Sequence, residues 1–397
     1  MAYVSLEKVY YTNRQEYEAE YLRRMNGISS VKIDFDISGH QAFYVVVPEM
    51  MEMLYRINMF DKKIIALRAA LPSVALTQYF TKSLQEEVYQ SLDIEGVYST
   101  RKEISDARKG PATNRLHSMV RRYVMLEQGG NITLSSCKDI RAIYDEVCLD
   151  EVLRENPKNA PDGTIFRTEP AHVYTKADNL IHSGLFPENK IDEAMTKALK
   201  FLTREEIDMI VRTAVFHYML EYIHPFYDGN GRLGRYICSC LLATVLDPLI
   251  GVRLSYSINM NRQAYYKMFK DANEKKNRGD LTSFILEFLR ILMVSYDNLF
   301  LALDKRVKDL NDAFDKLVLP IQDEKTSNVI QVLLQATLFG HQGVTKNELA
   351  EYSNAGLRVV NRILKCNEYA SWVAMEKDGK RKLYRLNKDT VEGALNA

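Results

Sequence analysis

The stretch from His224 to Arg235, HPFYDGNGRLGR in one-letter code, constrains the fold of this chain more than any other segment. Apolar residues recur at helical spacing on both sides of it. We therefore expect an amphipathic helix over Thr203–Ile223, with Thr203 and Glu206 as a capping box, and a second helix beginning near Gly231. The proline at the second position ends the first helix, because the residue before a proline avoids the right-handed helical conformation. The stretch is thus predicted to be a loop between two helices.

The composition of this loop predicts an anion site. Gly229 and Gly231 flank Asn230, and we expect both glycines to take positive φ and turn backbone N–H groups inward. The following helix adds the positive end of its dipole. Arg232 and Arg235 lie three residues apart on its first turn, where each could contact a different phosphate of a polyphosphate.

Two further residues of the loop predict a reaction beside the anion. Asp228 offers a hard oxygen ligand that suits Mg²⁺ next to phosphates. His224, with an ordinary pKa near 6.5, can accept a proton from a hydroxyl at neutral pH. We expect Phe226 to point into the core and anchor the loop. The pattern differs from a Walker A loop, which ends in Gly-Lys-Ser/Thr, and from a Rossmann fingerprint, which follows a strand.

The stretch resembles, without a gap, the HPFxDGNGRxxR signature of the Fic domain, whose members typically transfer AMP from ATP to protein hydroxyls. The resemblance implies that His224 is the catalytic base and Asp228 the Mg²⁺ ligand. It implies that Arg232 and Arg235 contact the β- and γ-phosphates. The phosphate cradle that it implies consists of Gly229, Asn230 and Gly231.

An upstream segment adds an inhibitory element by the same resemblance. A helix is predicted at about residues 74–96, where Ser91 and Glu95 lie four apart on one face and Gly96 supplies the stop. By itself a glutamate before such a glycine says little. The sequence SLDIEG, however, is similar to the family's inhibitory (S/T)xxxE(G/N) motif. This implies that Glu95 pairs with Arg235 and takes the arginine that the γ-phosphate would use.

A downstream helix is a candidate for the adenine pocket. Tyr266, Phe269 and Asn273 fall on one helical face, which suits stacking and hydrogen bonding of a base, although the same spacing fits an aromatic face in the core. Fic proteins place a Tyr-Tyr-x-x-Leu-x-x-x-Asn pattern here, and Phe269 departs from its usual leucine. The resemblance covers roughly residues 74–299.

Composition bounds the remaining possibilities. With 53 Lys and Arg against 52 Asp and Glu, the net charge is +1, which gives no global attraction to nucleic acid or membrane. The five cysteines lack metal-ligand spacing and fit a reducing cytoplasm. No segment reaches the length of a membrane span, and the N-terminus lacks an apolar signal region. We expect a cytoplasmic protein without membrane contact.

The predicted fold is mainly α, with a Fic-type helical core and three parts. Residues 1–110 form an N-terminal helical segment with a short hairpin over 31–47, and 111–310 form the catalytic domain, with the boundary at Gly110-Pro111. A β-hairpin flap at about Pro170–His182 is implied by the resemblance, and its backbone would pair with the target as an added strand. A strand is expected at Val252–Ser255.

Residues 325–397 resemble a winged helix-turn-helix. Thr345 and Glu348 form a predicted capping box, and Asp378-Gly379 predicts a hairpin turn. A helix is expected to begin at Ser353. Its apolar side chains should face inward, and these are Leu357, Val360, Ile363 and Leu364. Its basic side chains should face outward, and these are Arg358, Arg362 and Lys365. Such a domain binds DNA or protein, and the sequence leaves both open.

The leading hypothesis is an autoinhibited protein adenylyltransferase that uses Mg²⁺-ATP and modifies a Ser, Thr or Tyr hydroxyl of a protein, the chain itself included. The alternatives are a Fic-fold enzyme that uses another nucleotide or removes AMP, and a DNA-binding regulator whose Fic part senses nucleotides. A homodimer is left open.

Overall fold

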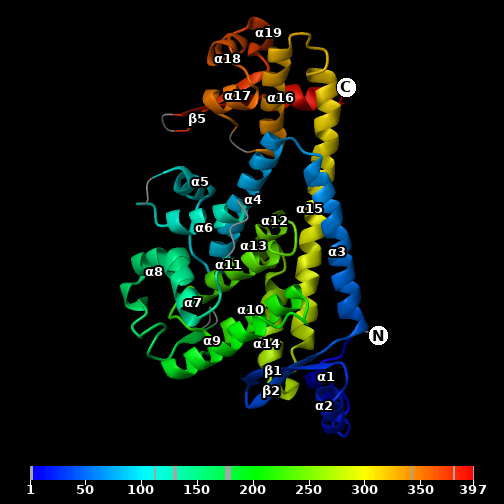
Figure 1. Cartoon of the computed structure of the whole chain (residues 1–397), viewed down its shortest axis with the longest axis vertical. Helices are drawn as coiled ribbons and strands as arrows, with labels where there is room; N and C mark the ends of the chain where they lie inside the picture. Colours follow the sequence, from blue (N-terminus) through cyan, green and yellow to red (C-terminus); the bar gives the residue numbers. More distant parts are fainter. Residues whose placement is uncertain are drawn as a thin grey trace. The chain divides into compact units, whose positions relative to one another are not determined.

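The computed structural model describes residues 3–110, 113–127, 132–174, 180–340, 343–378 and 381–396. Within these ranges the chain is mainly helical, and its paired strands form antiparallel two-stranded sheets (Figure 1). This confirms the predicted fold class. Among the described residues, no helix combines the length and the apolar composition that crossing a membrane requires.

The chain divides into two compact units, the first made of Met1–Asp61 and Leu84–Tyr296 and the second of Lys62–Ser83 and Asp297–Ala397. The division falls within three long helices, which are α3 (Pro48–Ala69), α4 (Ser73–Ile94) and α15 (Thr282–Leu317). The other helices of the first unit are α1 (Leu6–Thr12), α2 (Tyr17–Met25), α5 (Arg101–Lys109), α6 (His117–Glu127), α7 (Cys137–Tyr144), η1 (Asp145–Leu149), α8 (Asp150–Glu155), η2 (Pro157–Asn159), α9 (Glu188–Leu202), α10 (Met209–Ile223), α11 (Asn230–Ala243), α12 (Pro248–Gly251), α13 (Leu254–Met260), α14 (Arg262–Asn273) and η3 (Lys275–Asn277). Its strands are β1 (Ser30–Ile37), β2 (His40–Val45), β3 (His172–Tyr174) and β4 (Leu180–Ser183).

Helix α10 lies at the centre of the first unit, packed against α9 and α11. Almost every side chain from Ile210 to Ile223 is buried, so the helix is apolar all round rather than amphipathic. The predicted start at Thr203 is wrong. Thr203 is the C-cap of α9, where its hydroxyl donates to the Lys200 carbonyl at 2.9 Å, and α10 instead begins after Asp208, whose carboxylate accepts from the N–H of Ile210 at 2.8 Å.

The strand expected at Val252–Ser255 is also absent from the described structure, which has α12 and α13 there. The reason is a tertiary contact that local propensity does not show. The carboxylate of Glu87, on α4, accepts hydrogen bonds from the N–H of Ser255 at 2.8 and 2.9 Å and so caps the first turn of α13. Glu87 is fully buried, and burial raises its pKa to about 7.

Two predicted hairpins are present in the first unit. Strands β1 and β2 pair through a turn at Ser38 and Gly39, which both have positive φ, as a tight hairpin turn requires. Strands β3 and β4 pair at the predicted flap, although residues 175–179 of that segment lie outside the described residues. Pro111 of the predicted boundary and Gly379 of the predicted turn also lie outside them.

The second unit contains, beyond its parts of α3, α4 and α15, the elements α16 (Glu324–Phe339), α17 (Lys346–Tyr352), α18 (Leu357–Ile363), α19 (Asn367–Ala370), β5 (Val373–Asp378), β6 (Arg381–Leu386) and α20 (Lys388–Asn396). The capping box of Thr345 and Glu348 is confirmed. On α18, Val360 and Ile363 are buried, whereas Leu357 is 47% exposed, contrary to expectation. Positions six residues apart lie about 120° apart around a helix, so Leu357 falls on the flank of the buried face.

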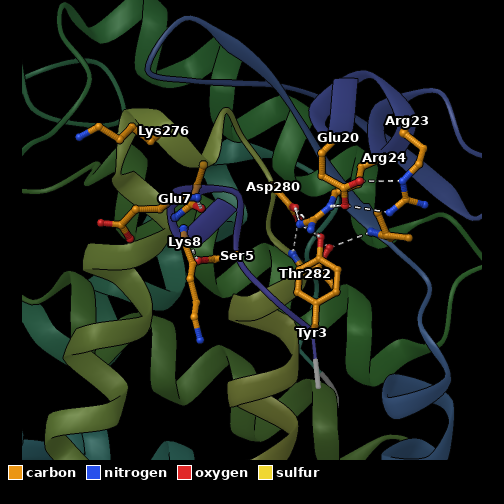
Figure 2. A network of polar contacts seen from close by, with 12 residues as sticks. Tyr3, Ser5, Glu7, Lys8, Glu20, Arg23, Arg24, Lys276, Asp280 and Thr282 are labelled. Atoms are coloured by element: carbon orange, nitrogen blue, oxygen red, sulfur yellow. Dashed lines mark hydrogen bonds and ion pairs between the residues drawn. The ribbon is translucent and has the colours of Figure 1, made fainter. Parts of the chain in front are cut away.

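A buried polar network joins the N-terminal helices to the start of α15 (Figure 2). The Tyr3 hydroxyl donates to Asp280 Oδ2 at 2.5 Å, and Arg24 Nη1 lies 2.8 Å from the Tyr3 oxygen and 3.3 Å from the same carboxylate oxygen. Asp280 also caps α15, since its Oδ1 accepts from the N–H and the hydroxyl of Thr282. Burial and the charge of Asp280 raise the pKa of Tyr3, which keeps its hydroxyl a donor. The network fixes the segment that follows α14.

We expect Arg24→Met to lower the unfolding free energy of the first unit by about 3 kcal/mol, because it leaves the buried Asp280 carboxylate without its cation. Arg23→Met is the matched control, since Arg23 also pairs with Glu20 but has a side chain 71% exposed, and it should cost about 0.5 kcal/mol or less. Calorimetric unfolding of both variants tests this. Equal shifts in the two variants would contradict it.

Candidate active site

His224 lies where α10 ends. It is the C-cap residue, with φ 52° and ψ 63°, so it has left the right-handed helix as its place before Pro225 predicted. A non-glycine residue in this left-handed region is uncommon and is held by its surroundings. Burial, followed by the charges of His182 and Arg167, lowers the pKa of His224 to about 3. The imidazole is therefore neutral at neutral pH and able to accept a proton.

The loop after His224 is closed by its own side chains. Phe226 is fully buried and stacks on Tyr144 with ring centroids 3.7 Å apart, which confirms its predicted anchoring role. The Asn230 side chain accepts from the N–H of Phe226 at 3.0 Å and donates to its carbonyl at 2.8 Å. Since both ends of this buried amide bond within the loop, we expect Asn230 to meet an anion through its backbone N–H.

Gly229 and Gly231 must be glycine for different structural reasons. Gly229, with φ 85°, is the left-handed N-cap of α11, as expected. Gly231 lies in the first turn of α11 with no positive φ, so that part of the expectation is wrong. A Cβ at Gly231 would lie 2.2 Å from Oε1 of Glu95 and 3.0 Å from Nη1 of Arg235. Glycine is needed here because a carboxylate approaches the helix closely.

Arg235 is held by the end of α4. Its Nη1 lies 2.6 Å from Glu95 Oε1, its Nε donates to Ser91 Oγ at 3.1 Å, and its Nη2 donates to the Ser91 carbonyl at 2.8 Å. The guanidinium is 1% exposed, while the Glu95 side chain remains 32% exposed. Burial raises the pKa of Glu95, but the charge and hydrogen bond of Arg235 outweigh it, so the net shift is downward. Glu95 is thus an anion that lies against the N-terminal turn of α11.

Arg232 has two carboxylate partners, one of which sequence reasoning missed. Its Nη2 donates to Asp228 Oδ1 at 3.0 Å, and its Nη1 forms an ion pair with Glu151 of α8. Arg232 and Glu151 are 1% and 4% exposed. Arg115 lies 3.9 Å from the same Glu151 carboxylate. Glu151 stands in a helix with no motif, so only its place in the fold identifies it.

The predicted adenine-pocket residues of α14 contact two different parts of the structure. The Tyr266 hydroxyl donates to the carbonyl of Ile94 at 3.0 Å, and Arg262 donates to the same carbonyl at 2.5 Å, so both hold the C-terminal end of α4. Phe269 and Asn273 instead lie beside Tyr218, which stacks near Phe269 and donates to Asn273 Oδ1 at 2.7 Å. The structure therefore brings Phe269 and Asn273 together, with Tyr266 directed to α4.

A second acidic residue near Arg235 was also missed by sequence reasoning. Burial, followed by the charge of Glu95, raises the pKa of Glu221 to about 8. Its Oε1 and Nδ1 of His217 would lie 2.8 and 3.0 Å from a Cβ on Gly234. Within the described residues neither atom has a hydrogen-bond partner. Glu221 is therefore mainly protonated at neutral pH and adds little negative charge beside Arg235.

The donor set at Asp228 fits one mode of Mg²⁺ binding. Among the described residues, no group of three or more His, Cys, Asp and Glu side chains could enclose a metal ion. Mg²⁺ commonly binds through one or two carboxylates together with substrate phosphates, and Asp228, whose side chain is 36% exposed, can supply one. Burial raises the pKa of Asp228, which a bound cation would oppose.

Comparison with known proteins identifies the region that holds the loop from His224 to Arg235, together with Glu151 and Glu221. Residues 133–242 match the model of the Fic/DOC family. Over 105 residues the chain is 31% identical to the probable protein adenylyltransferase of Aquifex aeolicus (strain VF5). The matched stretch covers 25% of this chain and 31% of that protein. Over 109 residues it is 31% identical to protein adenylyltransferase Fic of Nematostella vectensis, covering 26% and 23%. The chain thus matches less than a third of the length of these curated relatives.

The fold has a solved counterpart. The crystal structure of a Fic family protein from Desulfovibrio desulfuricans G20 superposes with a TM-score of 0.54 at 19% identity, covering 87% of this chain and 98% of that one. At this identity the likeness supports the fold and not the activity.

We expect His217 and His224 to lower the free energy of unfolding as pH falls below about 6.5, because folding depresses their pKa to about 3 and unfolding between these values takes up a proton at each. Glu87 and Glu221, whose pKa folding raises, act in the opposite direction, so the test compares a histidine variant with the wild type. Each histidine should cost about 2 kcal/mol at pH 5 relative to pH 7. In His217→Gln, unfolding should take up one proton fewer than in the wild type. The slope of the unfolding free energy against pH, measured by denaturant titration from pH 5 to 7, should change accordingly. An unchanged slope would contradict the depressed pKa.

Proposed function

We propose that this chain, a Fic domain protein by its match over residues 133–242, is a protein adenylyltransferase that Glu95 restrains. The observation that carries the proposal is the contact of Glu95 and Ser91 with Arg235 at the N-terminus of α11, one loop away from a neutral His224. A helix N-terminus with buried guanidinium groups is suited to phosphate, and an imidazole beside it is suited to accept a proton. The names of the adenylyltransferase relatives support AMP as the group transferred.

Charge supports the need for a divalent cation and for release of Glu95. Arg232 and Arg235 face three carboxylates, those of Glu95, Asp228 and Glu151. Both guanidinium groups are thus already paired with carboxylates, which disfavours a triphosphate. Removing Glu95 frees the charge of Arg235, and Mg²⁺ held by Asp228 would neutralise the phosphates and stabilise the leaving pyrophosphate.

In the proposed reaction the chain's residues position the nucleotide and move one proton. The α11 N-terminus and Arg235 hold the phosphates, and Phe269 and Asn273 contact the base. The hydroxyl oxygen of a Ser, Thr or Tyr attacks the α-phosphorus as its proton passes to Nε2 or Nδ1 of His224. The bond to pyrophosphate breaks, and AMP remains on the protein through a new phosphodiester.

The free energy of the contact between Glu95 and Arg235 is of the order that such a restraint requires. Holding a reaction down by a hundredfold requires about 2.7 kcal/mol. Removing one partner of a buried ion pair typically costs about 3–5 kcal/mol, and Glu95, which is partly exposed, falls toward the low end. The contact is therefore strong enough to suppress activity and weak enough for a ligand or partner to displace.

We expect Glu95→Gln to increase transfer of AMP by about a hundredfold, because the amide has no charge with which to compete for Arg235. The assay follows label from α-phosphate-labelled ATP onto the chain and onto proteins of a cell extract. Adding His224→Ala should abolish the gain. Glu86→Gln is the matched control, since Glu86 lies on the same helix but pairs with the half-exposed Arg101, and it should leave labelling unchanged.

The same experiment separates the enzymatic alternatives. Labelled GTP or UTP in place of ATP tests another nucleotide. Loss of AMP from a labelled protein with the wild-type chain, and not with Glu95→Gln, would favour removal of AMP with Glu95 as a base. Equal ATP labelling with and without Glu95 would contradict the restraint.

A second candidate function belongs to the second unit. Arg358, Arg362 and Lys365, on α18 and just after it, are all exposed, as expected. Helices α16 to α18 precede the β5–β6 hairpin, which is the element order of the predicted winged helix-turn-helix. These cations could contact DNA phosphates or base edges.

If this unit binds DNA, Arg358→Ala with Arg362→Ala should weaken binding at least about tenfold in a gel shift with double-stranded DNA from the gene's own upstream region. Lys388→Ala, which removes an exposed cation from α20, serves as the control. Binding that is absent in the wild type, or equally weak in both variants, would leave α18 without a DNA role.

A further inference from the structure

Arg167 is a buried cation whose partners are backbone carbonyl groups. Its side chain has 0% exposure. Nε donates to the carbonyl of His224 at 2.9 Å, Nη1 to that of Glu169 at 2.6 Å, and Nη2 to that of Leu185 at 2.8 Å. In the described residues no carboxylate forms an ion pair with it. Burying a charge without a counter-ion is costly, so its three hydrogen bonds must offset a large desolvation penalty.

The three carbonyl groups belong to three separate pieces of the site. His224 ends α10, where the helix dipole places negative charge that suits a guanidinium. Glu169 precedes β3, and Leu185 follows β4, so these two carbonyls lie at the base of the β3–β4 hairpin. The planar guanidinium of Arg167, whose N–H groups point in fixed directions, therefore joins the turn at His224 to both ends of the hairpin.

Backbone hydrogen bonds follow the same connection. The N–H of Arg167 donates to the carbonyl of Pro225 at 3.3 Å, and that of Leu185 to the carbonyl of Ile223 at 3.0 Å. The N–H of Gly184 donates to the carbonyl of Ala171 at 3.0 Å. The base of the hairpin is thus attached to the two residues that flank His224.

Gly184 shows how closely these pieces approach. A Cβ there would lie 2.4 Å from Nη2 of Arg167, 2.8 Å from Cβ of His224 and 3.0 Å from the carbonyl oxygen of Ile223. Since Gly184 has no positive φ, its requirement for glycine is steric. The hairpin, Arg167 and His224 leave no space for a methyl group between them.

We propose that Arg167 is a positioning residue that holds the His224 imidazole and the base of the β3–β4 hairpin in one fixed geometry. This rests on the proposed function, in which His224 accepts the proton of a hydroxyl, and on the expectation from the family resemblance that the hairpin pairs with the target segment that carries it. Proton transfer requires the base within hydrogen-bond reach of that hydroxyl. Arg167 sets this distance because it fixes both the base and the surface on which the target lies.

The first test measures the geometry without any enzymatic activity. Hydrogen–deuterium exchange is followed by mass spectrometry in the full chain carrying Arg167→Met, with Arg141→Met as the matched control. Arg141 also donates to a backbone carbonyl, that of Ile165 at 2.8 Å, but among the described residues it has no hydrogen bond or ion pair to His224 or to the hairpin. We expect faster exchange in peptides over 166–174, 182–187 and 222–228 in Arg167→Met alone, with exchange in α9 and α11 unchanged. Unchanged exchange in those peptides would overturn the proposal.

The second test measures the reaction in the Glu95→Gln background, as the rate of self-labelling against ATP concentration. Arg167→Met should lower the maximal rate by about a hundredfold, as small misplacements of reacting groups do. The half-saturating ATP concentration should change by less than about twofold, because the nucleotide contacts are on α11 and α14. Arg167→Lys, which keeps the charge but lacks the planar set of donors, should recover only part of the rate. A rise in half-saturating ATP with an unchanged maximal rate would contradict positioning.

Other outcomes are also decisive. If Arg167→Met does not fold, Gly184→Ala applies the same test, because its methyl group displaces Nη2 of Arg167 and Cβ of His224 from the other side. If no variant labels any protein but the exchange pattern is as expected, the proposed reaction fails while the geometric role of Arg167 stands. If labelling occurs and the maximal rate is indifferent to both Arg167→Met and Gly184→Ala, the positioning role fails while the proposed reaction stands.

Discussion

The ion pair of Arg235 with Glu95 is the interaction on which the rest of the site depends. A buried guanidinium must have acceptors, and here they are Ser91, in the last turn of α4, and Glu95, which directly follows that helix. The same pairing accounts for Gly231, because the carboxylate occupies the space that a side chain there would fill. It also leaves the α11 N-terminus facing an anion that the protein supplies itself. Any outside anion that uses this helix end must compete with Glu95.

The second arginine follows the same electrostatic rule with less freedom. Arg232 and Glu151 are both almost completely buried, whereas Glu95 is a third exposed. Breaking the pair of Arg232 with Glu151 would separate two charges that are both buried, which is costly. The two arginines therefore differ in the exposure of their carboxylate partners, although their spacing in the sequence makes them look equivalent.

Sequence patterns predicted those parts of the site that depend on short-range chemistry. The loop from His224 to Gly229, the anchoring of Phe226 and the helix that carries Ser91 follow from spacing, turn residues and a recognisable motif. The β1–β2 hairpin and the mainly helical fold were predictable for the same reason. Contacts made across the fold were not predictable. Glu151, Arg167 and Glu221 stand in segments without a motif, and only burial beside an arginine or a backbone carbonyl distinguishes them.

The errors in secondary structure at Thr203 and at Val252 have the same origin. Thr203 has the sequence of a helix N-cap, but the helix before it uses its hydroxyl first. The segment at Val252 has strand propensity, but a carboxylate from α4 supplies the helix cap that overrides it. Propensity is a weak prior wherever a tertiary partner satisfies the backbone.

That carboxylate has a consequence for how α4 can respond. Glu87, Ser91 and Glu95 follow one another at intervals of four residues, so they form one line along the helix, with Glu87 bound to α13 two turns before Glu95. Sliding or lifting the whole helix would expose α13's first turn and a buried carboxylate together. The lower-energy way to uncover Arg235 is a change confined to the last turn, where the chain leaves the helix at Gly96 with φ 77°. A change confined to Glu95 would therefore leave the contact of Glu87 with α13 intact.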